Sequence, residues 1–279
     1  MGVGIPIRNI PQRVLDEVVL GLQHFLVPLF FLRPQNSEPQ VRFIGSGTLV
    51  EIQGTHHILT AAHVWHETEG AEEIGLVLTA SRSRFMMPRD AISVKQLWDH
   101  KHPEWGPDLA LLQLARPIVS TIAAQKSFLN LAQQRATLAA HPPATEKGLW
   151  AVTGLVGEFS KVQRHPEEGT IIATAPVRAF FSAVQETHQR GGYDYLDLGA
   201  KLGLSDVPSS FGGVSGGGLW EVGLSMSKSG TISWDERRHF RGVAFWQSRP
   251  SVGRRVIRCH GPRSIFERAW ESWGLTRDG

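Results

Sequence analysis

The stretch Gly212-Gly213-Val214-Ser215-Gly216-Gly217-Gly218-Leu219-Trp220 places five glycines around one serine. Glycine costs conformational entropy, so we expect such a run where the backbone needs a positive φ or where another group approaches it closely. A serine on a turn without bulky neighbours presents its hydroxyl to a substrate, and free N–H groups beside it stabilise a developing negative charge. This pattern suits acyl transfer. The alternative is a glycine-rich surface loop with an incidental serine.

A histidine follows an apolar strand upstream, in Leu59-Thr60-Ala61-Ala62-His63. The small alanines allow close backbone packing, and a histidine fixed at a strand end can act as a general base because its ordinary pKa lies near neutrality. The alternative is a core histidine without a chemical role. His56, His57 and His66 lie nearby, but their spacing matches no zinc motif. We therefore predict no metal site.

An aspartate opens the apolar segment Asp108-Leu109-Ala110-Leu111-Leu112. A carboxylate at the mouth of a buried strand needs a cationic or N–H partner. His63 can supply it, because an aspartate that accepts the Nδ1–H of an imidazole fixes the tautomer and stabilises the imidazolium formed in catalysis. A structural role at a turn is the alternative for Asp108.

Read together, these three segments resemble the trypsin-like (chymotrypsin-fold) serine peptidases, and they occur in that family's order. The resemblance implies an all-β fold of two antiparallel β-barrels with the active site between them. It implies a serine endopeptidase that cleaves a polypeptide substrate through an acyl-enzyme and needs no cofactor. By the same resemblance His63 is the general base, Asp108 its orienter and Ser215 the nucleophile, and the backbone N–H groups of Gly213 and Ser215 form the oxyanion hole.

The chain departs from the family pattern at two places in the serine segment. Val214 stands where many members carry an aspartate that pairs with a newly cleaved N-terminus, so activation by cleavage is not expected. Gly218 replaces a common proline and removes no catalytic group.

Four further residues are expected to bind substrate. By the resemblance, Ser209 lies at the base of the primary specificity pocket, where a neutral hydroxyl argues against selection of Arg or Lys. Phe245, Trp246 and Gln247 resemble the strand that binds the substrate backbone; Phe245 falls where a small residue is common, and Gln247 narrows the pocket. We therefore expect small or medium apolar side chains to be preferred at the cleaved bond.

The order of elements agrees with many short strands. We expect residues 1–40 to hold an N-terminal helix and the first strand, 41–135 a barrel with His63 and Asp108, and 136–279 a second barrel with Ser215 and a terminal helix. Within these parts we expect a helix over Pro11 to Phe25, a bend at Gly45-Ser46-Gly47, a linker over Ser120 to Ala140, a loop over Arg190 to Ser210 and a helix over Arg263 to Gly274.

Composition limits the remaining choices. The 279 residues are 41 % hydrophobic and 20 % charged, as in soluble globular proteins. The one cysteine, Cys259, excludes an intramolecular disulfide and is expected to be buried and inert. Polar residues interrupt the most apolar stretch, Val18 to Leu32, and no secretory signal precedes it, so we predict a cytoplasmic protein without membrane contact.

Nine arginines and one acid lie between Arg237 and Arg268. No nucleic-acid-binding motif accompanies them, and we expect them to decorate the surface rather than to bind nucleic acid.

Two other functions compete with the peptidase. The segment Gly213 to Gly217 also fits the G-x-S-x-G elbow of α/β-hydrolases, with Asp235 and His239 or His260 as partners, but that elbow requires a helix directly after the serine. The second alternative is a peptidase-like domain that binds a peptide or a regulatory protein without cleaving, or that acts only when such a partner orders it. The departures in the glycine segment and the expected loop over Arg190 to Ser210 motivate it.

Overall fold

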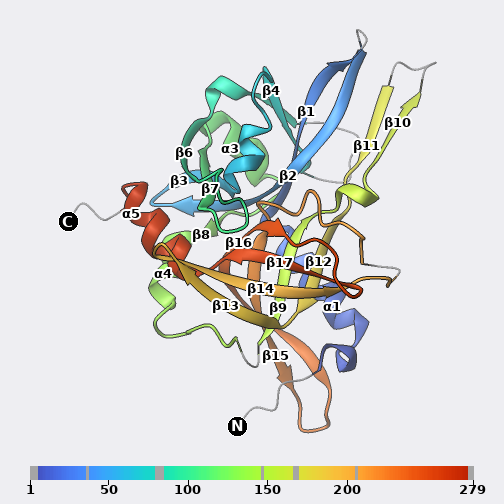
Figure 1. Ribbon diagram of the computed structural model, residues 1–279, viewed down its shortest axis with the longest axis vertical. Coiled ribbons are helices and arrows are strands. Elements are labelled where there is room, and N and C mark those ends of the chain that lie inside the picture. Colours follow the sequence, from blue (N-terminus) through green and yellow to red (C-terminus); the bar gives the residue numbers. More distant parts are fainter. Residues whose placement is uncertain are drawn as a thin grey trace.

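The computed structural model describes residues 6–35, 38–78, 85–145, 148–165, 170–204 and 207–275. The fold is mostly β, with one antiparallel sheet curled into a half-barrel and another large sheet (Figure 1). This arrangement is compatible with a chymotrypsin-like fold. No helix among these residues is long and apolar enough to cross a membrane.

The first sheet takes its strands from residues 26–130, in the order β5-β4-β1-β2-β3-β7-β6. Its strands are β1 (Leu26–Gln35), β2 (Glu38–Ile52), β3 (Thr55–Thr60), β4 (Glu73–Leu76), β5 (Phe85–Pro88), β6 (Ser93–Trp98) and β7 (Asp108–Gln113). The short β8 (Leu129–Asn130) pairs with β2 in parallel. His63 and Asp108 both lie where strands of this sheet end or begin.

A β-bulge bends β2 at the predicted place. Leu29 of β1 pairs with Gly45, and the next residue, Phe30, pairs with Phe43, so Ile44 is the extra residue. Such an insertion increases the local twist and redirects the strand. The residue after Gly45, Ser46, is fully buried and bonds the serine segment of the second sheet.

The second sheet takes its strands from residues 149–260, in the order β12-β9-β15-β16-β17-β14-β13. They are β9 (Leu149–Leu155), β12 (Val177–Ser182), β13 (Val184–Arg190), β14 (Tyr193–Lys201), β15 (Gly218–Met226), β16 (Ile232–Gln247) and β17 (Arg254–His260). A separate hairpin of β10 (Lys161–His165) and β11 (Thr170–Thr174) projects beside the end of β1 and β2 (Figure 1).

The expected loop over Arg190 to Ser210 is wrong for its first half, because β14 fills it. This strand pairs with both β13 and β17, and its side chains Tyr195, Leu196 and Leu198 are buried. The glycines that suggested a loop form the turn before the strand, where Gly191 and Gly192 have positive φ.

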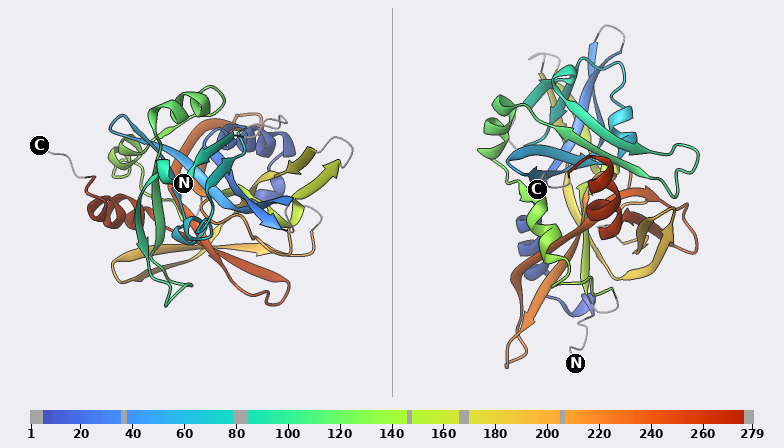
Figure 2. Two further views of the ribbon diagram at one scale, coloured as in Figure 1. Left: turned by 90° about the horizontal axis from the view of Figure 1, so that it is seen from above. Right: turned by 90° about the vertical axis from the view of Figure 1, so that its left-hand side faces the viewer.

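Helices close the molecule at both ends of the chain. The predicted N-terminal helix is α1 (Gln12–Gln23), which buries Val14, Val18 and Leu22 and packs against β16 of the second sheet. Figure 2 (right) shows α1 in blue beside the long orange hairpin of β15 and β16. The terminal helix comprises a π-helical segment (Ser264–Ala269) and α5 (Trp270–Ser272). It is capped by Asp194, whose carboxylate accepts the N–H of Ser264 at 2.6 Å.

The segment expected as an irregular linker contains helices. These are α3 (Arg116–Ala123) and α4 (Leu131–Thr137). The side chain of Asn130 caps α4 by accepting the N–H of Gln133 at 2.8 Å. The alanine- and glutamine-rich composition of this segment supports helix formation.

Candidate functional site

His63 and Asp108 meet where two neighbouring strands of the first sheet end and begin. His63 lies in the short helix α2 (Ala62–His66), directly after β3, and Asp108 opens β7, which pairs with β3. The Nδ1 atom of His63 lies 2.6 Å from Oδ2 of Asp108, and the His63 backbone N–H donates to Oδ1 at 2.9 Å. Asp108 is buried, whereas the His63 side chain is 33 % exposed. The imidazole is thus held on its Nδ1 side and reachable from solvent.

The two groups shift each other's pKa in opposite directions. Burial by itself lowers the pKa of His63, but the hydrogen bond and charge of Asp108, with the charge of Glu67, raise it above its ordinary value. Burial by itself raises the pKa of Asp108, but the hydrogen bonds and charge of His63 lower it below its ordinary value. This pair therefore stabilises an imidazolium beside an ionised carboxylate.

A second histidine contacts Asp108 from the other sheet. His260 of β17 is fully buried, and its Nε2 accepts the backbone N–H of Asp108 at 3.1 Å. Its ring stacks on Phe245, with ring centroids 4.3 Å apart. Sequence reasoning considered His260 only as a partner in an α/β-hydrolase and missed this contact. The only feature of the sequence that could have indicated this contact is the position of His260 at the end of a run of strand-forming residues.

The serine segment forms a tight turn against the bulge of β2. Gly213 and Gly216 have φ of +93° and +87°, a conformation that side chains rarely adopt. A Cβ at Gly216 would overlap the carbonyl oxygen of Ser46. Ser46 holds the turn with its N–H, which donates to Ser215 O at 2.8 Å, and with its hydroxyl, which donates to Gly213 O at 2.7 Å. These contacts explain why the segment is rich in glycine.

Hydrogen bonds also orient the peptide groups beside Ser215. The carbonyl of Gly212 accepts the N–H of Gly157 at 2.8 Å, and that of Val214 accepts the N–H of Gly217 at 2.9 Å. Because C=O and N–H point in opposite directions across a trans peptide, the N–H groups of Gly213 and Ser215 point away from these partners. Neither N–H donates to an acceptor in the described part of the chain.

Ser215 lies close to the helix that carries His63. Gly45 separates the two: a Cβ there would lie 2.6 Å from the side chain of Val64 and 3.0 Å from Ser215 O. The Ser215 hydroxyl donates to the carbonyl of Phe245 at 3.4 Å. Within the described residues it makes no hydrogen bond to His63.

Gln247 closes the space between β16 and the segment that leads to the serine. Its Oε1 accepts the N–H of Phe211 at 2.9 Å, and its Nε2 donates to the Ser210 hydroxyl at 3.3 Å. Arg255 reinforces this bridge by donating to Gln247 Oε1 at 3.2 Å and to Ser209 O at 2.7 Å. The end of β16 is thereby joined to the segment that leads to Ser215.

The other three predicted substrate-binding residues have different surroundings. Ser209 is exposed, and its hydroxyl donates to Glu158 at 2.8 Å. Phe245 is buried against His260. Trp246 is half-buried, with the Arg258 guanidinium 5.2 Å from its ring centroid. The structure thus brings Phe245 to Ser215, whereas the Ser209 side chain bonds Glu158.

An open pocket of about 460 Å³ borders the turn at Gly212 and Gly213. It is shared by both sheets, since its walls include residues of β2 and of the segments around Glu158 and Ser210. Its lining residues are Arg42, Phe43, Ile44, Glu67, Leu155, Gly157, Glu158, Ser209, Ser210, Gly212 and Gly213. A chain segment bound at the serine turn would have room on this side.

No family model matches the chain, and no curated protein does. The assignment of function therefore depends on the geometry of the chain's own residues.

Val214 has apolar surroundings, and the lack of activation by N-terminal cleavage stays a prediction from the sequence. Val214 is buried in an apolar cluster with Trp150, Phe211 and Cys259. A new amino terminus would find no carboxylate at this position. The prediction that Cys259 is buried is confirmed, and burial raises the pKa of its thiol well above the ordinary value.

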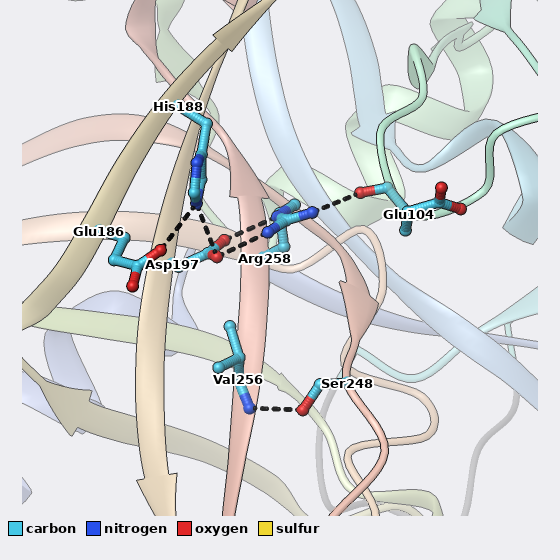
Figure 3. Close-up of polar contacts among 7 residues, drawn as sticks. All are labelled: Glu104, Glu186, His188, Asp197, Ser248, Val256 and Arg258. Atoms are coloured by element: carbon cyan, nitrogen blue, oxygen red, sulfur yellow. Dashed lines mark hydrogen bonds and ion pairs between the residues drawn. The ribbon is translucent and has the colours of Figure 1, made fainter.

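One cluster outside this site has possible metal ligands. Glu186, His188 and Asp197 place one ligand atom each within 4.8 Å of one another. Figure 3 shows the Arg258 guanidinium against both Asp197 oxygens, at 2.7 Å each, and against the Glu104 carbonyl. His188 Nε2 lies 3.1 Å from Asp197 Oδ2, so it acts as a proton donor. A protonated nitrogen and a buried guanidinium disfavour a cation, and the groups fit an ion-pair network better.

The expectation that the C-terminal arginines decorate the surface is confirmed for the exposed Arg237, Arg249, Arg254, Arg263 and Arg268 and is wrong for two others. Arg258 and Arg241 are buried, and Arg241 pairs with Glu221 at 2.7 Å. Arg237 stays exposed and pairs with Asp235. These arginines bind acids within the protein.

The α/β-hydrolase alternative is wrong for this chain. Ser215 is followed by two glycines and then by β15, not by a helix. Asp235 pairs with Arg237, and His239 packs on His141 with ring centroids 5.0 Å apart.

Proposed function

We propose that the chain is a serine endopeptidase with the two-barrel architecture of the trypsin-like family. In this proposal His63 is the general base, Asp108 its orienter and Ser215 the nucleophile. The observation that carries the proposal is the 2.6 Å contact between His63 Nδ1 and the buried carboxylate of Asp108, next to a serine turn with oriented backbone N–H groups. A histidine with a purely structural role has no need of this combination.

The proposed reaction begins with proton transfer from the Ser215 hydroxyl to Nε2 of His63 as Oγ attacks the scissile carbonyl. The N–H groups of Gly213 and Ser215 bind the oxyanion, and each such donor contributes about 3 to 4 kcal/mol to transition-state stabilisation. The imidazolium then protonates the leaving amine, which departs from the acyl-enzyme. Water, activated by His63, hydrolyses the ester and restores Ser215. Asp108 stays ionised throughout.

The resting hydroxyl must turn before this reaction. Its hydrogen bond to Phe245 O is long, at 3.4 Å, and therefore weak. Catalytic hydrogen bonds are often poorly aligned in free enzymes and tighten when substrate binds. We expect rotation about the Cα–Cβ bond of Ser215 to direct the hydroxyl to His63.

The contacts of Gln247 support a preference for small or medium apolar side chains at the cleaved bond. In this proposal the bridge from Gln247 to Phe211 and Ser210 lies beside the bound side chain and limits its size. Profiling with a peptide library tests this preference, and Gln247→Gly should extend it to larger residues. A profile of the parent protein dominated by basic residues would contradict it.

A peptidase-like binding domain is the second candidate. The resting bond from Ser215 to Phe245 O, rather than to His63, favours it. The expected loop no longer supports this candidate, because β14 takes up much of that region. The cytoplasmic location and the lack of a cofactor stay predictions from the sequence.

Labelling with a fluorophosphonate probe distinguishes the two candidates. The probe reacts with a serine only where a base and an oxyanion hole are assembled. We expect the parent protein to be labelled at Ser215, and Ser215→Ala and His63→Ala to remain unlabelled. A parent that is folded by circular dichroism but unlabelled would contradict an autonomous peptidase and favour the binding domain.

A further inference from the structure

The backbone N–H of Asp108 lies beyond the ladder that joins β7 to β3. Pairing between these strands ends at Thr60 and Ala110, and Asp108 lies two residues before Ala110, outside this pairing. A buried N–H without an acceptor costs about 1 to 3 kcal/mol. His260 supplies the acceptor at 3.1 Å, across 152 positions of sequence and from the other sheet.

The surroundings of His260 define its protonation. Because Nε2 accepts a hydrogen bond, the proton of the neutral ring resides on Nδ1. Burial lowers the pKa of His260 to about 3, so the ring stays neutral at ordinary pH. Aromatic rings surround it: Phe245 stacks at 4.3 Å, and Tyr195 and Tyr193 lie 5.3 and 6.3 Å away between ring centroids. Among the described residues, Nδ1 has no hydrogen-bond partner.

The position of His260 links two parts of the site. Its edge fixes the backbone from which the Asp108 carboxylate projects, and its face packs on Phe245, whose carbonyl accepts the Ser215 hydroxyl. A displaced Asp108 would lengthen the 2.6 Å contact to His63. The orientation of the base thus depends on a residue that touches neither substrate nor nucleophile.

We propose that His260 is a positioning residue, whose neutral imidazole holds the Asp108 backbone and thereby sets the strength of the Asp108 to His63 hydrogen bond. This inference rests on the proposed peptidase function for its effect on rate. Its effect on His63 is independent of any reaction.

Two substitutions separate hydrogen bonding from packing. His260→Phe keeps an aromatic ring against Phe245 but leaves the Asp108 N–H without an acceptor. His260→Gln loses the ring but retains an amide oxygen at a similar reach. His57→Phe is the matched control, since His57 is also a buried strand histidine with an unpartnered nitrogen but makes no contact with Asp108 among the described residues.

The first measurement is the pKa of His63, from NMR titration of its ring protons. We expect a value above about 6.5 in the parent, in His260→Gln and in the control. In His260→Phe it should fall toward that ordinary value, because the Asp108 carboxylate is less well aligned. A His260→Phe protein that is folded and has the parent's His63 pKa would overturn the proposal.

The second measurement is the rate constant of fluorophosphonate labelling. It should fall about ten- to hundred-fold in His260→Phe, the effect of one buried hydrogen bond, and only a few-fold in His260→Gln. If the parent is not labelled but its His63 pKa responds as expected, the peptidase proposal fails and the positioning role stands. If the parent is labelled and His260→Phe changes neither readout, the positioning role fails alone.

A third variant keeps the test decisive if His260→Phe does not fold. His260→Asn has the same amide as His260→Gln on a shorter side chain, which does not reach the Asp108 N–H. The proposal requires a lower His63 pKa in His260→Asn than in His260→Gln. Equal parent-like values in the two amide variants would overturn it.

Discussion

The Asp108 carboxylate accepts both the ring and the backbone N–H of His63, one on each oxygen. Two bonds from one residue fix both the distance and the plane of the imidazole. Because the carboxylate is buried, its charge acts on His63 with little screening by water. Burial lowers the pKa of His63, and the hydrogen bond and charge of Asp108 are the main reason that the pKa is nevertheless raised.

The pH dependence of reactivity follows from this pair. His63 must be neutral to accept a proton, and its pKa is raised, so labelling of Ser215 should increase with pH with a midpoint above about 6.5. Asp108→Asn should lower that midpoint, because the carboxylate no longer stabilises the imidazolium, and should reduce the maximum rate about 10⁴-fold. Labelling rates from pH 5 to 9 check both. An unchanged midpoint in Asp108→Asn would contradict the assigned cause.

Ser46 offers a test of how the serine turn is held. Its buried hydroxyl donates to Gly213 O and accepts the N–H of Leu155, at 2.7 and 2.8 Å. Ser46→Ala leaves both groups unpaired and should lower the free energy of unfolding by about 1 to 3 kcal/mol, with slower labelling of Ser215. Urea unfolding measures the change. Ser225→Ala, which removes an exposed hydroxyl, should have almost no effect; equal losses would argue against this role of Ser46.

Among single residues, those that lie in a short sequence motif could be predicted. His63, Asp108 and Ser215 each stand in a local pattern, whereas Ser46 and His260 bond backbone groups that lie 167 and 152 positions away. No local pattern encodes such a bond. The bridge of Gln247 could be expected as a narrowing of the pocket, but not its partners Phe211 and Arg255.

Among the elements, the serine turn has the strictest steric requirement. Gly216 and Gly230 have similar positive φ, +87° and +82°. A Cβ at Gly216 would overlap Ser46 and Thr60, whereas nothing lies within 4 Å of one at Gly230. Comparison of Gly216 with Gly230 thus separates the cost of a positive φ from the cost of a steric overlap.

Substitution by alanine should reveal that difference. Gly230→Ala carries only the cost of the backbone conformation, about 1 to 2 kcal/mol. Gly216→Ala must also displace the bulge of β2, and we expect a loss above about 4 kcal/mol, or a protein that does not fold. Denaturant unfolding compares the two. Similar losses would show that the turn has room that the packing of Ser46 and Thr60 does not suggest.

Elements that a regular spacing of apolar residues or a group of glycines marks in the sequence could be predicted, and others could not. The spacing of apolar residues was sufficient to predict α1, and the glycines around Ser46 were sufficient to predict the bulge in β2. For β14, flanking glycines obscured a strand whose burial comes from pairing with β13 and β17. For α3 and α4, short helices depend on caps and packing more than on periodicity.

The two sheets share one interior. One core cluster contains Leu59 and Leu109 of the first sheet together with Trp220 and Phe240 of the second. Arg258 adds a polar link, since it bonds Asp197 within the second sheet and the carbonyl of Glu104, in the segment before Asp108. The segment that leads to Asp108 is therefore one of the places where the two sheets are joined.

Removal of this link should affect the whole fold. Arg258→Met leaves the Asp197 carboxylate buried without its cation, and we expect the free energy of unfolding to fall by about 3 to 5 kcal/mol. The double variant Asp197→Leu and Arg258→Met removes both charges and should be more stable than the single one. Urea unfolding of the four proteins of this cycle tests the expectation. Additive losses would show that the two charges are not coupled.

The bonds that hold the serine turn and the Asp108 backbone join positions 46 with 213 and 108 with 260. Each therefore connects an early part of the chain with a late one. During translation the bond from Ser46 to Gly213 must wait for the serine turn, and the bond from Asp108 to His260 must wait for β17. Contacts so distant in sequence also form slowly. A chain interrupted before β17 would consequently lack the acceptor that His260 provides for the Asp108 N–H, so the surroundings of the His63 and Asp108 pair are complete only in chains that carry both sheets.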